Sequence, residues 1–203
     1  MESPSTPRSR KGAATRARLV EAGRVVFERD GFLEARVSDI AKEAGLSHGS
    51  YYHYFDSKEQ LFREVAEGQE ARLTAHPEVR ATTADPASPV ERIREANRRY
   101  FERYRDAARL MGVIEQVSRY DAQVNAARMA TQRHFAERSE RAIRRWQADG
   151  LVDPGLDPVV AADALGAMTA RFAELWLVQG YRDYEFDAAV DQVTRLWVNA
   201  LGL

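Results

Sequence analysis

The 203-residue sequence contains no cysteine, which excludes disulfide bonds and thiolate metal sites. It has four histidines, and none of them stands in an HExxH or similar metal-binding spacing. No long uncharged apolar run occurs, and the N-terminus lacks the apolar segment of a secretory signal. We therefore expect a soluble cytoplasmic protein with no metal site, no cofactor and no membrane partner.

The sequence also has no large excess of charge of one sign, since its formal net charge is only -1. A nearly neutral protein does not coat nucleic acid over its whole surface, but one end of it can still bind DNA. Basic residues gather near the start of the chain, where only Glu2 opposes them. They are Arg8, Arg10, Lys11, Arg16 and Arg18.

Strand-like alternation bounded by hairpin turns is absent, and apolar residues recur instead at helical spacing. The sequence predicts an all-α protein. The expected helices cover about 13–31, 37–44, 49–55, 57–75, 90–105, 109–119, 122–149, 158–179 and 187–201. We expect a disordered basic arm at 1–12, a DNA-binding domain at 13–56 and a larger helical domain at 57–203, with a proline-containing loop at 76–89.

Two short helices within 37–55 are joined by a tight turn at Gly45 and Leu46. This spacing is typical of a helix-turn-helix, whose second helix enters the major groove of DNA. Ser47 is a suitable N-cap for that second helix, and Ser57 with Gln60 is a suitable capping box for the next one.

The second helix carries consecutive aromatic residues with polar tips at Tyr52, His53 and Tyr54, and these cannot all face inward. Tyr51 and Phe55, four residues apart, are predicted to pack in the core. On residue types alone, core packing and DNA contact remain equally open for such a stretch.

The segment resembles the DNA-binding domain of the TetR family of bacterial regulators. The matching residues are Phe27, Gly31, Phe32, Ile40, Ala41, Ala44, Gly45, Leu46, Ser47, Gly49, Tyr52, Tyr54, Phe55, Lys58 and Leu61. The resemblance implies a homodimeric all-α fold, with an N-terminal three-helix helix-turn-helix domain and a larger C-terminal helical bundle.

The resemblance also implies site residues. Ser38, His48, Gly49 and Ser50 match positions that touch bases or nearby phosphates, and Tyr52, Tyr54 and Lys58 match phosphate-contacting positions. Where the family often has a capping Thr or Ser, this chain has Arg36, so the cap is lost unless Ser38 shifts to fill it, and Arg36 can reach phosphate instead. The expected DNA-binding set is Arg36, Ser38, Ser47, His48, Gly49, Ser50, Tyr52, His53, Tyr54 and Lys58.

By the same resemblance, the C-terminal part contains a dimer interface and an effector pocket, although ordinary intrachain core remains the alternative for each residue. The expected dimer interface comprises Val159, Ala162, Leu165, Gly166, Val193, Leu196, Trp197 and Ala200. The expected pocket comprises Phe101, Tyr104, Met111, Ile114, Glu115, Met129, Gln132, Phe135, Met168, Phe172 and Trp176.

The sequence thus predicts a ligand-responsive transcriptional repressor that a small, largely apolar effector releases from a palindromic operator. Its expected partners are double-stranded operator DNA, a second copy of itself and an unidentified small molecule. An effector-independent DNA-binding protein and a helical-bundle enzyme are the alternatives. We expect no enzyme and no catalytic residue, because no GxSxG, P-loop or GxGxxG sequence is present.

Overall fold

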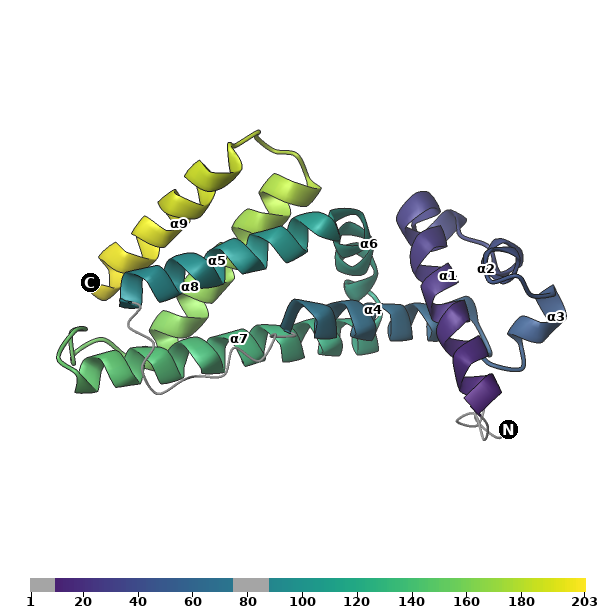
Figure 1. The fold of residues 1–203 in the computed structure, drawn as a ribbon, viewed down its shortest axis with the longest axis horizontal. Helices are drawn as coiled ribbons and strands as arrows, with labels where there is room; N and C mark the ends of the chain where they lie inside the picture. Colours follow the sequence, from purple (N-terminus) through teal and green to yellow (C-terminus); the bar gives the residue numbers. More distant parts are fainter. Residues whose placement is uncertain (1–9, 75–87) are drawn as a thin grey trace. The chain divides into compact units, whose positions relative to one another are not determined.

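The computed structural model describes residues 10–74 and 88–203, and these residues form helices and connecting turns without a β-strand (Figure 1). They belong to two compact units. Unit 1 contains the described residues up to Glu70 together with Arg109–Ala127, and unit 2 contains the described residues of Ala71–Ala108 together with Arg128–Leu203. The predicted all-α class is confirmed.

Helix α1 (Arg10–Glu34) begins three residues before the predicted start at Ala13. Residues 10–12 are therefore helical and not part of a disordered arm, while residues 1–9 of that predicted arm lie outside the described residues. Gly31 interrupts the helix with a φ of 74° and a ψ of 176°, a conformation that glycine adopts easily. The predicted end of the regular helix at Gly31 is thus confirmed.

Helices α2 (Val37–Glu43) and α3 (His48–Tyr51) pack against each other across the predicted turn. Gly45 has a φ of 66° there, and its amide donates to the Lys42 carbonyl at 2.9 Å. Ser47 caps α3, because its Oγ accepts from the Ser50 amide at 3.2 Å. The helix-turn-helix predicted from the spacing is therefore present.

Helix α4 (Lys58–Thr74) follows a cap at Ser57, whose Oγ accepts from the Gln60 amide at 3.2 Å. The other half of the predicted capping box differs, because Gln60 Oε1 accepts from the Asp56 amide at 2.6 Å and reaches one residue further back. Phe62 on α4 packs edge-on against Phe27 and Phe32, with ring centroids 4.9 and 5.0 Å apart.

That aromatic cluster explains why the first part of α4 belongs with α1 in unit 1 and not with the C-terminal helices. Unit 1 also contains most of α6 (Ala108–Ser118) and the start of α7 (Ala122–Ala148). Arg63 on α4 donates to Asp121 just before α7 at 2.9 Å. The units therefore divide the chain differently from the predicted border between residues 56 and 57.

Unit 2 is built from α5 (Pro89–Asp106), the remainder of α7, α8 (Pro158–Ala173), a π-helical turn η1 (Glu174–Val178) and α9 (Phe186–Leu201). Helix α5 begins with a full capping box between Ser88 and Glu91. The predicted N-cap of α8 is confirmed, since Asp157 accepts from the amides of Val159 and Val160.

Helix α5 packs along α9 (Figure 1), and a buried bond from Asn97 Nδ2 to Thr194 Oγ1, 3.2 Å long, joins the two helices. Most of the predicted loop at 76–89 lies outside the described residues. None of the helices in the described part of the chain has the length and hydropathy needed to cross a membrane.

Candidate nucleic-acid interface and cavity

Helix α3 has one face in the core and one face in solvent. Tyr51 and Phe55 are completely buried, as predicted, and the Tyr51 hydroxyl donates to the Ser57 carbonyl at 2.9 Å. Burial raises the pKa of Tyr51, so this phenol remains a hydrogen-bond donor at any physiological pH. These two rings hold α3 in a fixed orientation on unit 1.

The other side chains of this segment point outward. Ser47, His48, Gly49, Tyr52 and His53 are exposed, and Ser50 and Tyr54 are half-buried. The rings of His48 and Tyr52 meet edge to face at a centroid distance of 5.3 Å. The outward face therefore presents hydroxyl, imidazole and phenol groups around a glycine, without an aliphatic patch.

The N-terminal part of α1 extends this polar face. A shallow groove lies between α1 and α3, and its lining residues are Lys11, Ala14, Thr15, Arg18, Leu46, Ser50, His53 and Tyr54. Lys11 and Arg18 were not in the predicted binding set, although both belong to the basic cluster near the start of the sequence. The helical spacing of that cluster was the signal that could have identified them.

Arg16 lies in the same cluster but is directed into unit 1. Its guanidinium pairs with Glu64 and lies over the Phe55 ring, with Cζ 4.5 Å from the centroid. Arg36 is exposed at the N-cap of α2, and its side chain makes no capping bond. The predicted loss of this cap is confirmed, and Ser38 remains exposed.

Lys58 requires a correction. Its ammonium donates to the carbonyls of Phe32, Leu33 and Ala35 at 2.7, 3.2 and 2.9 Å, and it lies 4.7 Å from the centroid of the Phe32 ring. An ammonium has three N–H donors, so these bonds use all of them. Lys58 therefore closes the end of α1 in this structure, and no donor is left for the predicted phosphate contact.

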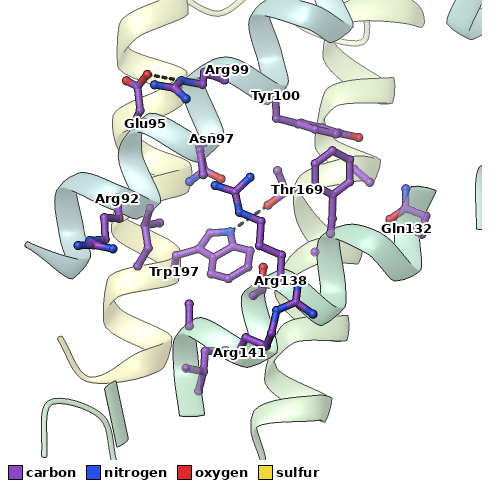
Figure 2. Close-up of a pocket in the computed structure, with 18 of the residues that line it drawn as sticks. Arg92, Glu95, Asn97, Arg99, Tyr100, Gln132, Arg138, Arg141, Thr169 and Trp197 are labelled. Carbon is purple, nitrogen blue, oxygen red and sulfur yellow. Dashed lines mark hydrogen bonds and ion pairs between the residues drawn. The ribbon is translucent and has the colours of Figure 1, made fainter. Parts of the chain in front are cut away.

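Unit 2 contains a cavity of about 620 Å³ between α5, α7, α8 and α9, which is open to solvent on the side of Arg138, Arg141 and Arg145 (Figure 2). Its floor contains the buried side chains of Ile93, Asn97, Ile143, Trp146, Thr169 and Trp197. Trp197 Nε1 donates to Thr169 Oγ1 at 2.9 Å, and the same hydroxyl donates to the Leu165 carbonyl at 3.0 Å.

Of the predicted pocket residues, Gln132 and Phe135 line this cavity. Phe101, Phe172 and Trp176 instead pack against one another, with ring centroids 5.6 to 5.9 Å apart. Tyr104 is buried against Tyr100, and Met168 is half-buried outside the lining.

The remaining predicted pocket residues lie elsewhere. Met111 and Ile114 are buried in unit 1, and Glu115 of the same unit pairs with Arg119 at 2.7 Å. Met129 has 41% of its surface exposed. The predicted set is therefore not the lining of the unit 2 cavity, since helical spacing alone does not show which neighbour a buried side chain meets.

The predicted dimer residues fall into two groups. Val159, Leu196 and Ala200 are exposed, as an interface with a second chain requires. Ala162 and Val193 are buried within the chain, while Gly166 and Trp197 line the cavity and Leu165 is half-buried.

Residues 19–65 match the family model described as "Bacterial regulatory proteins, tetR family". This match covers the helix-turn-helix and parts of the helices on either side of it, α1 and α4. Residues 19–65 therefore belong to the DNA-binding domain of the TetR family. Within the described residues, no cluster of three or more His, Asp or Glu side chains could hold a metal ion.

The chain is 46% identical over 55 residues to the HTH-type transcriptional regulator YdgC of Bacillus subtilis, covering 27% of this chain and 28% of YdgC. It is 29% identical over 139 residues to the HTH-type transcriptional repressor KstR2 of Mycobacterium tuberculosis, covering 64% of this chain and 62% of KstR2. The matches thus span between about a quarter and three fifths of these relatives.

Solved structures resemble the whole fold. The fatty acid degradation regulator FadR of Bacillus halodurans superposes with a TM-score of 0.71 at 18% identity, over 95% of this chain and 96% of that one. The transcriptional regulator FadR of Bacillus subtilis, in complex with stearoyl-CoA, gives 0.70 at 18% identity, over 90% and 97%. The TetR-like fold is therefore shown over nearly the full chain.

Proposed function

We propose that this protein is a transcriptional repressor that binds a palindromic DNA operator as a homodimer and is released by a small effector. The observation that carries the proposal is the outward polar face of α3, held in place by the buried rings of Tyr51 and Phe55. A helix presented in this way fits the major groove of B-form DNA.

Each side chain of this face has a role by its chemistry and position. His48, Gly49 and Ser50 begin α3 and approach base edges, while Ser47 and Ser38 reach bases or nearby phosphates. Tyr52, His53 and Tyr54 end the segment with donors suited to phosphate oxygens. The basic side chains Arg36, Lys11 and Arg18 are exposed and supply the charge that holds the phosphate backbone.

Homodimerisation provides the two recognition helices that a palindrome needs. We place the interface on the outer faces of α8 and α9, where the apolar side chains Val159, Val160 and Leu196 are 43%, 63% and 52% exposed. Exposed aliphatic residues at this density are typical of a surface that a second subunit covers.

The effector site in this proposal is the unit 2 cavity. A volume of about 620 Å³ accommodates an organic molecule of drug or metabolite size. The Bacillus subtilis FadR structure, which shares the fold, contains stearoyl-CoA, and this supports a ligand-responsive regulator here. The effector would favour a conformation that binds operator weakly, so that each ligand lowers the affinity for the other by the same factor.

The test begins with selection of bound sequences from random DNA duplexes, followed by anisotropy titrations at several salt concentrations. We expect one palindrome to bind in strong preference to random DNA. Arg36→Ala should lower the affinity for the palindrome and for random DNA alike, and should make both affinities less dependent on salt. Arg29→Ala is the matched control, because Arg29 is exposed on α1 and paired with Asp30. Recovery of no palindrome, or equal effects of the two variants, would contradict the proposal.

A further inference from the structure

The cavity in unit 2 is lined by far more basic than acidic side chains, which a site for a neutral apolar effector does not need. Its charged lining residues are Arg92, Arg99, Arg103, Arg138, Arg141, Arg145, Glu91 and Glu95. Glu91 is held in the capping box of α5, and Glu95 pairs with Arg99. Among the described residues, the lining therefore has an excess of four positive charges.

These arginines come from two facing helices. Figure 2 shows Arg92 and Arg99 on α5, with Arg99 turned towards Glu95, and Arg138 and Arg141 on α7. Arg103 donates to the Leu73 carbonyl at 2.9 Å, which ties its guanidinium to the end of α4. Arg141 has a carboxylate of Glu137 at 4.0 Å, outside hydrogen-bonding distance.

The cationic groups repel one another. Burial and the charges of Arg99, Arg141 and Arg103 lower the pKa of Arg138. Like charges gathered at one site raise the free energy of the empty protein, and a bound anion removes that cost. Guanidinium groups also bind carboxylate, sulfate and phosphate oxygens with paired hydrogen bonds.

The floor of the cavity has a different character from its rim. The Trp197 and Thr169 polar groups bond to each other and to the helix backbone, and Asn97 bonds to Thr194. The rings of Tyr100, Phe135 and Trp146 also line the cavity. The floor thus offers apolar and aromatic surface, while the rim offers charge.

We infer that the cavity binds an amphipathic organic anion, with the acidic head among the arginines of α5 and α7 and the apolar body against Trp146 and Trp197. This inference rests on the proposed function, because it names the chemical class of the effector. It replaces the largely apolar effector expected from the sequence, since a neutral hydrocarbon would not reduce the repulsion among the arginines that line the cavity.

The test compares two fluorescent probes that share one apolar body. Anilinonaphthalene sulfonate is the anion, and N-phenyl-naphthylamine lacks the sulfonate. We expect the wild-type protein to bind the anionic probe more tightly than the neutral one. Added salt should lower the affinity for the anionic probe only. Equal affinities, or the same salt response for both probes, would overturn the inference without any variant being made.

Variants then locate the site. Arg138→Gln and Arg141→Gln should each lower affinity for the sulfonate about three- to tenfold and leave the neutral probe unaffected. Arg144→Gln is the matched control, because Arg144 lies on the same helix, pairs with Glu140 and does not line the cavity. If Arg144→Gln lowered the affinity for the sulfonate probe as much as the two cavity variants do, the anion would bind outside the cavity.

A third variant tests the apolar end. A side chain added at Gly166 meets no atom within 4 Å at its Cβ, and Gly166 lines the cavity. Gly166→Leu should therefore fill the space and weaken both probes. Unchanged binding of both probes by this variant would show that they occupy another surface and would overturn the inference.

Competition identifies the acidic group. Dodecanoate and dodecyl phosphate should displace the sulfonate probe, and their relative affinities distinguish a carboxylate from a phosphate ligand, whereas dodecanol, which has only the apolar chain, should compete much more weakly. Operator binding is measured separately. If the anion binds but does not release operator, the cavity assignment stands and the proposed effector response is contradicted. If the protein binds operator but shows no preference for the anion, the inference about the cavity is contradicted and the proposed DNA binding stands.

Discussion

Lys58 shows how a single side chain can serve the fold where the sequence suggested a DNA contact. Its ammonium satisfies three carbonyls at the end of α1. Lys58→Met keeps the aliphatic stem but removes these donors, so we expect the free energy of unfolding to fall by about 1–3 kcal/mol. Urea denaturation measures this change, and DNA titration of the folded variant should give wild-type affinity.

Lys42 offers the matched control for this prediction, because it is exposed on α2. Lys42→Met should change the free energy of unfolding by no more than about 0.5 kcal/mol. A Lys58→Met variant of normal stability that had lost affinity for DNA would restore the phosphate contact predicted from the sequence.

Gly49 is the opposite case, a residue whose side chain would affect DNA binding and not the fold. A Cβ added there meets no atom within 4 Å, and the residue is exposed. Gly49→Ala should leave the melting temperature unchanged or slightly higher, because alanine favours helix by up to about 1 kcal/mol. Operator affinity should fall, because the methyl group occupies the space of a close DNA approach.

Gly68→Ala on α4 is the control, since Gly68 is also exposed and has an open Cβ position. It should have the same effect on the melting temperature and none on operator affinity. If Gly49→Ala bound operator as tightly as the wild type, α3 would not approach the groove at this position.

At the scale of the element, Asp121 joins the start of α7 to α4. Its Oδ1 accepts from the amides of Gln123 and Val124, and its Oδ2 accepts from Arg63 at 2.9 Å. Burial acts to raise the pKa of Asp121, but the bonds from Val124, Arg63 and Gln123 together outweigh it, and the pKa is lowered. The carboxylate therefore stabilises the folded state.

The sign of the pH effect follows from this lowered pKa. The stabilisation is present above the ordinary value of 3.8 and is lost as the pH falls through the lower value of the folded protein. Asp121→Asn should cost about 1 kcal/mol at neutral pH, because the amide keeps the cap and loses the charge. Denaturation at several pH values should show the difference shrinking below the ordinary pKa.

The ends and caps of the helices were the features that local sequence patterns predicted best. The ends at Gly31 and Gly45 and the caps at Ser47 and Asp157 follow from residue types within a few positions, because a cap or turn involves only neighbours along the chain. The last part of the predicted helix at 158–179 is the π-helical turn η1, which no local pattern indicated.

For the whole molecule, the proposed dimer gives a direct test. Leu196 is 52% exposed on α9, so Leu196→Glu should leave the folded subunit intact. Two carboxylates at an interface between identical copies repel each other and are costly to desolvate. We expect monomers in sedimentation and loss of palindrome binding, while weak binding to a single half-site remains.

Val90 provides the control surface, because it is 39% exposed at the start of α5 and outside the proposed interface. Val90→Glu should sediment as a dimer and bind operator normally. A Leu196→Glu protein that remained dimeric would move the interface away from this part of α9.

Local sequence was sufficient for the helices, their caps and the helix-turn-helix, and the buried pair Tyr51 and Phe55 follows from a spacing of four residues. Packing between distant segments decided the rest. The partners of Lys58 are more than twenty residues away in sequence, and the arginines around Trp197 come from two helices far apart along the chain. Periodicity shows that a side chain faces inward, but the group it meets depends on how the helices pack.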